Sequence, residues 1–470
     1  MPLFGKKKRM VCTDGIELTC PWCMRKFNSN MVHFRPTDER NGVEKDEILD
    51  NFWIYMADTE KGSQVKAIVP DRNNASQMLQ FEEHHNQNGH YRLLVSCADK
   101  FGNRVNHRIC PHCHNKLPPS LGVSCNTVIS VLGYTQIGKT IYLTSLLNWL
   151  ERSFANSIRG GWFGFVDDEM DAYQNRQYTK MLNGSIEATD VQFVSPIICE
   201  IGFSHPDGGN VSTIVSFYDF PGEAANAEME KIAANHIRNA SAMMLMFDLT
   251  KTQTFWNEHI QDEIEKRRRE MEIAIQKGDA LHADRFRNEI EKLEDSMRHP
   301  DQIWNSALGE YKPYLTIQQW IMQRMLAAVG GGGAQDPRPV AFTGTKSDEI
   351  FNGPRCREKC NNAYGTLRDN EDYKKAGYCY DLSRPERMDS FVRNYLLQED
   401  NGLKNYIQSR FSDYHFFAVS AMGQAYVNGE RGRELRQLVP AWRVEDPLLW
   451  LMYQLGFIPQ GSIIDRGRIK

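Results

Sequence analysis

Residues 133–140 read Gly-Tyr-Thr-Gln-Ile-Gly-Lys-Thr. The apolar run 127–132 before them predicts a buried strand, and residues 141–147 after them predict the first turns of a helix. A glycine-containing loop between a strand and a helix is the context that a phosphate-binding loop requires. The glycines let successive backbone N–H groups point at phosphate oxygens, and the helix N-terminus adds partial positive charge. The pattern therefore predicts a phosphate-binding loop.

Two side chains of this loop have expected roles. Lys139 is expected to reach the outer phosphates of a nucleotide, and the Thr140 hydroxyl is expected to ligate Mg²⁺. A chance match in a glycine-rich loop is the alternative, and the strand and helix on either side argue against it. The loop residues expected to bind the nucleotide are Gly133, Gln136, Ile137, Gly138, Lys139, Thr140 and Ile141.

Size and composition are those of an ordinary globular protein. The chain has 470 residues, of which 41% are hydrophobic and 25% charged, and its length suits about two or three domains. The net charge of −4 gives no global field that favours nucleic acid. No apolar run approaches the ~20 residues of a membrane span, and the basic run Lys6–Arg9 is not followed by the apolar core of a secretory signal. We therefore expect a cytoplasmic protein.

The chain contains eleven cysteines, and four of them form two Cys-x-x-Cys pairs, Cys20/Cys23 and Cys110/Cys113. Each pair points two thiolates at one metal, so the two pairs predict a tetrahedral four-sulfur zinc site in a reducing compartment. The pattern resembles a zinc ribbon, but the pairs lie much further apart than the roughly 15–20 residues that are usual.

The long segment between the cysteine pairs predicts an inserted small domain, so the zinc-ribbon-like module is expected to span residues 1–120. Residues 52–56 and 91–95 are predicted strands of this insert. A closed four-cysteine site has no open position, which favours a structural role, and a redox role is the alternative. We expect His112 and His114 not to be ligands, and we expect Cys12, Cys97 and Cys125 to be ordinary core or surface residues.

A second motif follows a predicted hairpin formed by strands 196–203 and 212–218. The second strand runs into Asp219-Phe220-Pro221-Gly222-Glu223. An acidic residue at the end of a strand, beside a phosphate loop, holds Mg²⁺ through water, and Asp219 has that place. The N–H of Gly222 is expected to bind the γ-phosphate, so this segment would distinguish a triphosphate from a diphosphate.

A third motif, Thr345-Lys346-Ser347-Asp348, ends the predicted strand 339–344. An aspartate here accepts hydrogen bonds from the guanine N1–H and exocyclic amine, which adenine does not offer in that arrangement. The stem of Lys346 is expected to stack on the base. A buried polar requirement of this kind discriminates strongly between bases.

These motifs occur in a fixed order, each at the end of a strand. Residues 126–425 resemble a P-loop GTPase of the translation-factor-related class, in which Asn is usual at the position of Thr345. The resemblance implies an α/β fold with a mainly parallel sheet flanked by helices, in a domain that spans 121–470. It also implies that backbone N–H groups at Ser420 and Ala421, after the last predicted strand, contact guanine O6. The implied cofactors are GTP and Mg²⁺, with Zn²⁺ in the other module.

A narrower resemblance comes from the Asp-Phe-Pro-Gly-Glu segment and from the closing helix at 445–452, where Asp446 is the expected N-cap and Pro447 the first helical residue. Both features are similar to bacterial GTPases of the double-GTPase type from conflict or antiviral defence systems. That likeness implies a nucleotide-dependent switch that works with protein partners, such as an operon-encoded effector or regulator. A second copy of the chain is the alternative partner.

Residues 255–330 form an insert that is long for a connection between core strands. Its apolar residues recur at helical spacing on both sides of Gly278-Asp279, which predicts two antiparallel charged helices with one apolar stripe. Either a solvated arm or a partner-binding arm fits this pattern. The basic run 266–269 is expected to be a salt-bridged helix face. The stripe residues are Ile260, Ile264, Met271, Ile275, Phe286, Ile290, Leu293 and Met297.

Hydrolysis also requires a positioned water. Thr189 is expected to cap Mg²⁺, with Thr179 as the alternative, and Glu223 stands where relatives often have the Gln that orients water. No residue is an obvious arginine finger, although Arg159 and Arg238 lie in suitable neighbourhoods. The catalytic residues expected are Lys139, Thr189 and Glu223, and intrinsic turnover is expected to be slow.

An ATPase and a zinc-dependent nucleic-acid-binding protein with a regulatory nucleotide domain remain the alternative functions.

Overall fold

The structure is a computed structural model of the chain. It describes residues 12–38, 40, 45–55, 65–86, 89–133, 137–158, 160–166, 168–183, 196–204, 210–219, 236–251, 253–298, 335–351, 380–397, 401–423, 427–429, 432–434 and 440–458. Two compact units make up the fold. Unit 1 comprises residues 1–131, 154–174 and 189–242, and unit 2 comprises residues 132–153, 175–188 and 243–470. The expected domain boundary at residue 120 stays a prediction.

Unit 1 contains strands that surround the predicted hairpin. Strand β11 (Asn210–Asp219) runs parallel to β8 (Cys125–Leu132) and antiparallel to β10 (Ile197–Ser204), and β10 pairs with β9 (Trp162–Phe165). The last six residues of β8 are all buried, as expected for a parallel strand that is covered on both faces. The predicted strand at 127–132 and the predicted hairpin are thus confirmed.

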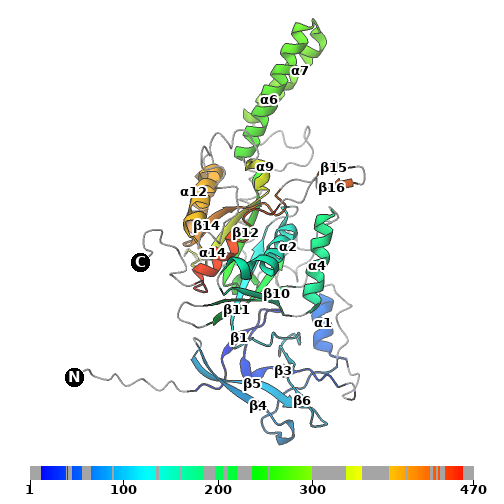
Figure 1. The fold of residues 1–470 in the computed structure, drawn as a ribbon, viewed down its shortest axis with the longest axis vertical. Helices are drawn as coiled ribbons and strands as arrows, with labels where there is room; N and C mark the ends of the chain where they lie inside the picture. The colour runs from blue at the N-terminus through cyan, green and yellow to red at the C-terminus, as the bar shows by residue number, and fades with distance from the viewer. Residues whose placement is uncertain are drawn as a thin grey trace, which may run out of the picture. The chain divides into compact units, whose positions relative to one another are not determined.

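The N-terminal part of unit 1 is built from short antiparallel pairs and one meander (Figure 1). The strand predicted at 91–95 lies within the meander. The pairs are β1 (Glu17–Thr19) with β2 (Lys26–Asn28) and β3 (His33–Phe34) with β7 (Arg108–Ile109), and the meander is β4 (Gln80–Asn86), β5 (Gly89–Ala98) and β6 (Arg104–Val105).

The strand predicted at 52–56 is wrong, because these residues belong to helix α1 (Glu47–Tyr55) as far as the helix extends. Leu49 and Trp53 are four residues apart and both are buried, whereas Ile48 and Ile54 are exposed. Burial therefore follows the helical period. Acidic residues in the first turn of α1 also suit a helix N-terminus.

Unit 2 holds a parallel three-stranded arrangement in which β13 (Val340–Thr345) lies between β12 (Ala242–Asp248) and β14 (Tyr414–Ala418). All residues of β12 and β13 are buried. The chain is therefore a mixed α/β protein with parallel strands in both units. The helices that unit 2 adds to these strands are α2 (Lys139–Trp149), α9 (Ser347–Phe351), α12 (Ser383–Leu397), α13 (Asn401–Arg410) and α14 (Asp446–Gln454).

Outside the insert, the other elements are short turns, one short helix, one longer helix and one small strand pair. They are the 3₁₀ turns at Ser29–Met31, Ala75–Gln77 and Leu249–Lys251, the π-helical turn Leu150–Phe154, α3 (Ala155–Ser157), α4 (Asp168–Leu182), and the pair β15 (Val427–Gly429) and β16 (Gly432–Glu434).

The insert contains the predicted helical hairpin. Helices α6 (Gln253–Gln276) and α7 (Ala280–Arg298) pack side by side (Figure 1) around buried Ile260, Ile264 and Ile290. Gly278 turns the chain with a φ of 73°, and an Asp279 carboxylate oxygen accepts from the N–H of His282. One residue of the predicted stripe is wrong. Ile275 is exposed, because the smaller Ala274 and Ala283 fill the contact between the helices near the tip.

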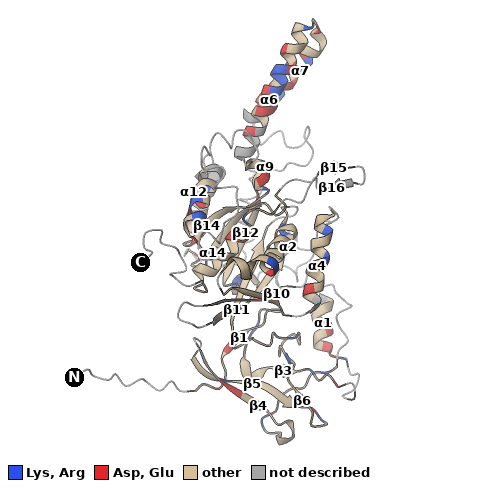
Figure 2. Ribbon diagram, viewed as in Figure 1, with Lys and Arg blue, Asp and Glu red and all other residues tan. Residues whose placement is uncertain are grey.

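Charged residues cover the outer faces of this hairpin (Figure 2). Arg267 pairs with Glu270 at 2.6 Å and with Glu289 of α7 at 3.1 Å, and Arg268 pairs with Glu294 at 2.9 Å. The basic run at 266–269 is thus a salt-bridged helix face, as predicted. In the described part of the chain, no helix combines the length and the apolar character needed to cross a membrane.

The closing helix α14 begins one residue earlier than expected. Glu445 is its N-cap, Asp446 is its first residue, and the predicted cap at Asp446 is wrong. The Asp446 carboxylate instead forms a fully buried ion pair with Arg443 at 2.5 Å. Arg443 has a positive φ of 54°, so this backbone conformation and this ion pair occur together just before the helix.

Candidate nucleotide site and metal centre

The predicted phosphate loop connects β8 to α2. A Cβ on Gly133 would collide with the Ile137 side chain and lie 3.1 Å from the Met246 carbonyl oxygen. Gly138 is the N-cap of α2 and has a φ of 87°, which favours glycine. The close approach at position 133 and the turn of the backbone at position 138 therefore both favour glycine. Gln136 lies outside the described residues.

Lys139 and Thr140 begin α2, as predicted. The Lys139 side chain is buried, and its Nζ donates to the Gly133 carbonyl oxygen at 2.9 Å, so the side chain folds back across the loop. The helix is fixed further along by Tyr142, whose hydroxyl donates to the Val444 carbonyl at 2.9 Å. These contacts hold the N-terminus of α2, a site of partial positive charge, against the loop.

Thr345, at the end of β13, connects the third motif to the phosphate loop. Its buried hydroxyl lies 2.7 Å from the Ile137 carbonyl oxygen and 3.1 Å from the Phe247 carbonyl oxygen. The single hydroxyl proton can serve one of these acceptors at a time. The structure thus brings together two motifs that lie about two hundred residues apart in sequence.

Lys346 follows with a positive φ of 58°. Its Nζ pairs at 2.5 Å with Asp248, a fully buried residue at the end of β12. The other oxygen of Asp248 accepts from the N–H and the hydroxyl of Thr250. Sequence reasoning missed Asp248, although its place at the end of a buried strand was a usable signal.

Asp348 lies in the first turn of α9 and is 6% exposed. The Ser420 hydroxyl donates to Asp348 Oδ1 at 2.6 Å, and the same hydroxyl accepts from the Gly423 N–H at 2.9 Å. Burial raises the pKa of the Asp348 carboxyl, and the bond from Ser420 opposes this shift. The contact leaves Asp348 Oδ2 and the second lone pair of Oδ1 able to accept from a ligand.

The loop after β14 is held from two sides. Ser420 exchanges backbone hydrogen bonds with Trp442, at 3.1 and 2.7 Å. The Ala421 carbonyl accepts from the Ser145 hydroxyl of α2 at 2.6 Å. The structure therefore gathers the phosphate loop, the Thr345–Asp348 segment and the Ser420–Ala421 loop in unit 2.

Several predicted residues cannot be placed in this site. Thr189, Gly222, Glu223 and Arg159 lie outside the described residues, and Asp219 is described only as the last residue of β11. The alternative threonine, Thr179, lies in α4, and its hydroxyl donates to the Asn175 carbonyl of the same helix at 2.9 Å. The roles of these residues in magnesium binding and hydrolysis stay predictions.

The four predicted zinc ligands form one cluster in unit 1. The ligand atoms of Cys20, Cys23, Cys110 and Cys113 all lie within 4.8 Å of one another. The Sγ atoms of Cys20 and Cys113 are 3.7 Å apart, and those of Cys23 and Cys110 are 3.8 Å apart. A tetrahedron with zinc–sulfur bonds of about 2.3 Å has edges of about 3.8 Å. The cluster therefore has the size that a four-thiolate zinc site requires.

The two cysteine loops have the same backbone geometry. Cys20 accepts from the N–H of Met24 and Cys110 from the N–H of His114, both at 3.0 Å. Met24 and His114 both have a positive φ, at 58° and 55°. The expectation that His112 and His114 are not ligands agrees with this cluster. Among the described residues, the ligand groups at this position are the four thiols.

His114 has a different role, which sequence reasoning missed. Its Nδ1 lies 2.8 Å from Asp46 Oδ1, and its Nε2 lies 3.0 Å from Nδ1 of His33. Arg35 donates to Asp46 and to the His114 carbonyl, each at 2.9 Å. This buried network holds the second cysteine loop against the segment before α1. Its members come from distant parts of the sequence, so no local pattern indicated it.

Tyr218 joins the first cysteine loop to β11. Its fully buried hydroxyl contacts the Pro21 carbonyl oxygen and lies 2.9 Å from the Trp22 carbonyl oxygen. Burial raises the pKa of Tyr218, so the hydroxyl keeps its proton and acts as a donor. Tyr218 is the residue before Asp219, so the strand end that carries the predicted magnesium residue is bonded to the cysteine loop.

We expect Tyr218→Phe to destabilise the protein by about 1–3 kcal/mol, because the variant leaves buried carbonyl oxygens without their donor. Urea unfolding followed by circular dichroism measures this loss. Tyr178→Phe is the matched control. Tyr178 is half-buried and its ring contacts Arg152, so its loss of a hydroxyl is expected to change stability by less than about 0.5 kcal/mol. Equal stability of Tyr218→Phe and wild type would contradict the expected contact.

Comparisons with known proteins give distant structural likenesses. No protein-family model matches the sequence, and no curated protein is significantly similar to it. The GTPase-like domain of S. cerevisiae Ski7 bound to GDP and inorganic phosphate is 12% identical, with a TM-score of 0.27, and the match covers 71% of this chain and 50% of that chain. The same domain bound to GTP is 11% identical, with a TM-score of 0.24 and coverages of 63% and 43%.

A third solved structure, the Schizosaccharomyces pombe YchF GTPase, is 10% identical with a TM-score of 0.17, and the match covers 63% of this chain and 66% of that one. The matched region thus spans about half of the Ski7 chains and about two thirds of the YchF chain. The arguments below rest on the contacts of this chain itself.

Proposed function

We propose that the chain is a P-loop GTPase, a GTP-binding and slowly hydrolysing molecular switch that works with partner proteins. The observation that carries the proposal is the hydrogen bond from Thr345 to the phosphate-loop carbonyl of Ile137. This bond supports the proposal because it joins the predicted phosphate loop to a segment in which the Ser420 hydroxyl donates to the buried carboxylate of Asp348. A ligand with phosphates at one end and guanine at the other would bind both the loop and the segment that contains Asp348.

The base end of this site favours guanine over adenine. Asp348 Oδ1 is occupied by the Ser420 hydroxyl, which leaves Oδ2 and the second lone pair of Oδ1 as acceptors. Guanine offers two adjacent N–H donors, N1–H and the exocyclic amine, whereas adenine has an unprotonated N1. A buried carboxylate that meets adenine N1 would lose its hydrogen bonds and face a lone pair. This chemistry supports GTP over the ATPase alternative.

The phosphate end supports a triphosphate with Mg²⁺. Lys139 and the backbone N–H groups at the start of α2 supply positive charge for the phosphates. Thr140 would ligate the metal, which would neutralise charge on the β- and γ-phosphates. The magnesium role expected of Asp219 stays a prediction. Lys139 already binds a loop carbonyl, so we propose that it exchanges this acceptor for phosphate oxygens when the nucleotide binds.

The four-cysteine cluster supports a structural Zn²⁺ site, because its sulfur spacing fits that ion and all four ligands come from the protein. Tyr218 bonds this module to the strand end before Asp219. The defence setting implied by the resemblance stays a prediction.

Lys139→Ala tests the proposed nucleotide site. Loss of a charged hydrogen-bond donor is expected to cost about 1.5–3 kcal/mol, which lowers the affinity for GTP by about 10- to 100-fold. Titration of a fluorescent GTP analogue with Mg²⁺ measures the affinity. Affinity for guanosine, which has no phosphates, is expected to stay unchanged.

Lys277→Ala, at an exposed position near the end of α6, is the matched control and should bind GTP as the wild type does. Wild-type affinity in Lys139→Ala would show that the loop does not contact phosphate.

A further inference from the structure

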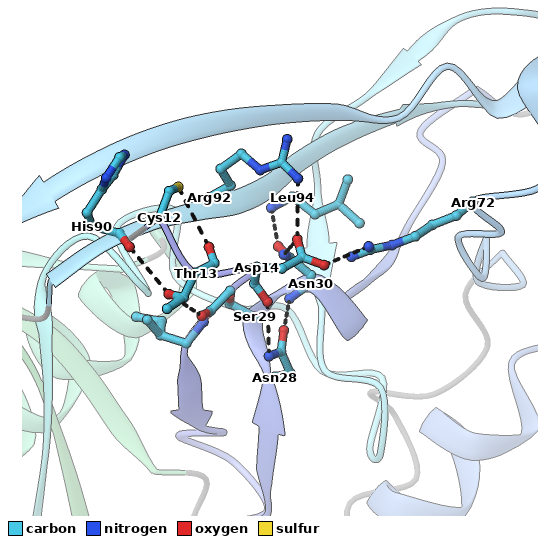
Figure 3. A network of polar contacts seen from close by, with 12 residues as sticks. Cys12, Thr13, Asp14, Asn28, Ser29, Asn30, Arg72, His90, Arg92 and Leu94 are labelled. Carbon is cyan, nitrogen blue, oxygen red and sulfur yellow. Dashed lines mark hydrogen bonds and ion pairs between the residues drawn. The ribbon is translucent and has the colours of Figure 1, made fainter. Parts of the chain in front are cut away.

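A short N-terminal segment of unit 1 pairs with strand β5 of the meander through an isolated β-bridge. Thr13 forms a parallel bridge with Tyr91 of β5. The N–H of Thr13 donates to the His90 carbonyl at 2.9 Å, and the N–H of Arg92 donates to the Thr13 carbonyl at 3.1 Å. The segment is also fixed through Asp14, which pairs with Arg72 at 2.7 Å and with Arg92 at 3.8 Å (Figure 3). Cys12 is therefore held beside β5 by backbone bonds and ion pairs.

The register of these strands determines which side chains share a face. Tyr91 is fully buried, so it marks the inner face of β5, and neighbouring residues alternate across the sheet. His90 pairs with His85 of β4 and Glu83 pairs with Arg92, so these residues lie on the outer face. The parallel bridge of Thr13 with Tyr91 puts Cys12 next to His90 on that same outer face.

Three metal-ligand types converge on this outer face. The ligand atoms of Cys12, Glu83 and His90 lie within 4.8 Å of one another, and Glu83 Oε2 is 3.5 Å from His90 Nε2. Cys12 and His90 are half-buried and Glu83 is exposed, so an ion can reach the group from solvent. Figure 3 shows Cys12 and His90 adjacent to each other at the edge of β5.

We propose that Cys12, Glu83 and His90 form a second metal site that binds a zinc-like divalent transition metal. Thiolate, imidazole and carboxylate are the three side-chain ligands that zinc accepts, and three protein ligands leave a fourth position open to water or a further ligand. The His85 ring stacks on the His90 ring with a centroid distance of 3.7 Å and supports its orientation. This site differs from the four-cysteine cluster, which has four thiolates.

The proposed second site predicts a difference in reactivity between the two metals. The Cys20 and Cys113 side chains of the first cluster are buried, whereas the second site includes the exposed Glu83 and an open position. The second metal is therefore expected to exchange and to be removed by chelators more readily. A surface Glu83–His90 ion pair without a metal is the alternative arrangement of these residues.

The test uses the full-length protein carrying one zinc per chain, kept reduced, and titrated with Co²⁺. Cobalt is the probe, because tetrahedral thiolate-bound Co²⁺ absorbs in the visible and near-ultraviolet range, while zinc is silent. The zinc retained by the protein is measured in parallel, which excludes exchange at the four-cysteine cluster. The variants are Cys12→Ser and Glu83→Gln, and the matched control is Glu82→Gln, a neighbouring exposed glutamate that points away from the group.

Wild type and Glu82→Gln are expected to bind one Co²⁺ per chain with a thiolate-to-cobalt absorption band while retaining their zinc. Cys12→Ser is expected to lose this band, and both Cys12→Ser and Glu83→Gln should bind the added metal at least about 10-fold more weakly, since even outer-shell changes cost 10- to 100-fold. Retained zinc in the variants shows that the module remains folded. No additional cobalt in the wild type, or equal binding by Cys12→Ser, would overturn the proposal.

Discussion

Asp348→Ala is expected to lower the affinity for GTP by about 100- to 10,000-fold and to leave the weak affinity for ATP unchanged. The reason is that the side chain would accept from two guanine N–H groups, and each hydrogen bond to a charged group is worth about 1.5–3 kcal/mol. Paired titrations of GTP and ATP analogues with Mg²⁺, on wild type and variant, measure the change. Equal binding of both nucleotides by the wild type would contradict guanine recognition and favour the ATPase alternative.

Asp348→Asn provides a sharper companion to this experiment. Its amide can donate to the carbonyl that xanthine carries in place of the guanine amine, so we expect affinity to shift from GTP toward the xanthine nucleotide. Burial raises the pKa of Asp348 in the folded protein, so ionisation of this carboxyl opposes folding as pH rises above the ordinary aspartate range. Asp348→Asn is therefore expected to fold at neutral pH at least as well as wild type.

The same pKa direction predicts how GTP binding depends on pH. The carboxylate form accepts from guanine, and a raised pKa means that this form is lost at a higher pH than for an ordinary aspartate. As pH is lowered, affinity for GTP should thus begin to fall at a higher pH than the ordinary pKa of an aspartate would give, which titration of a GTP analogue over a series of pH values measures.

Cys110→Ser is expected to remove zinc from the four-cysteine cluster and to unfold the module around it. Structural zinc sites contribute about 10–16 kcal/mol of binding free energy to folding in small zinc peptides. Here the metal would join Cys23 to Cys110 across a long loop, and the variant would lose both the bonds and the closure of that loop. Metal content by mass spectrometry and thermal unfolding measure the effect.

Trp22 gives a local readout of the same change. Its indole donates to the Lys116 carbonyl at 2.8 Å, and its ring meets Trp53 edge to face at a centroid distance of 5.8 Å. Both contacts link segments that the proposed metal would hold together, so the tryptophan fluorescence of Cys110→Ser should shift toward that of the unfolded chain. Cys125→Ser, at a half-buried cysteine outside the cluster, is the matched control and should keep its zinc. Full zinc content in Cys110→Ser would contradict a four-thiolate site.

The sequence was most informative where a local pattern fixes local geometry. The strand, the glycine loop and the helix around Lys139, the hairpin before Asp219, and the antiparallel arm each follow from spacing within a single segment. The pairing of two distant Cys-x-x-Cys loops was also predictable, because four thiolates at one metal are the common solution for such a pair of motifs.

The errors arose where a short segment can be read in two ways. Residues 52–56 are consecutive and largely apolar, which favoured a strand, but Leu49 and Trp53 are buried together at a spacing of four. At the arm tip, Ile275 seemed part of the stripe, yet the small Ala274 and Ala283 make the contact between the helices. The pattern of hydrophobic residues alone did not show which of two neighbouring faces is covered.

The missed residues act over long distances in the sequence. Asp248 anchors Lys346, Tyr218 binds the first cysteine loop, and Asp46 orients His114. Each pair is formed by packing of separate segments, and the partner that was missed belongs to none of the predicted motifs. Such polar contacts become visible only when the backbone brings the segments together.

The hydroxyl of Thr345 has a thermodynamic consequence for ligand binding. This hydroxyl, at the end of β13, lies within hydrogen-bond distance of the Phe247 carbonyl oxygen of β12 and of the Ile137 carbonyl oxygen of the predicted phosphate loop. If the proposed nucleotide site is correct, a guanosine fragment that restrains the end of β13 would also restrain the predicted phosphate loop, and a phosphate in that loop would favour binding of the base in return. The two fragments of the nucleotide are then cooperative ligands, and their covalent union in GTP binds more tightly than the sum of the separate affinities suggests.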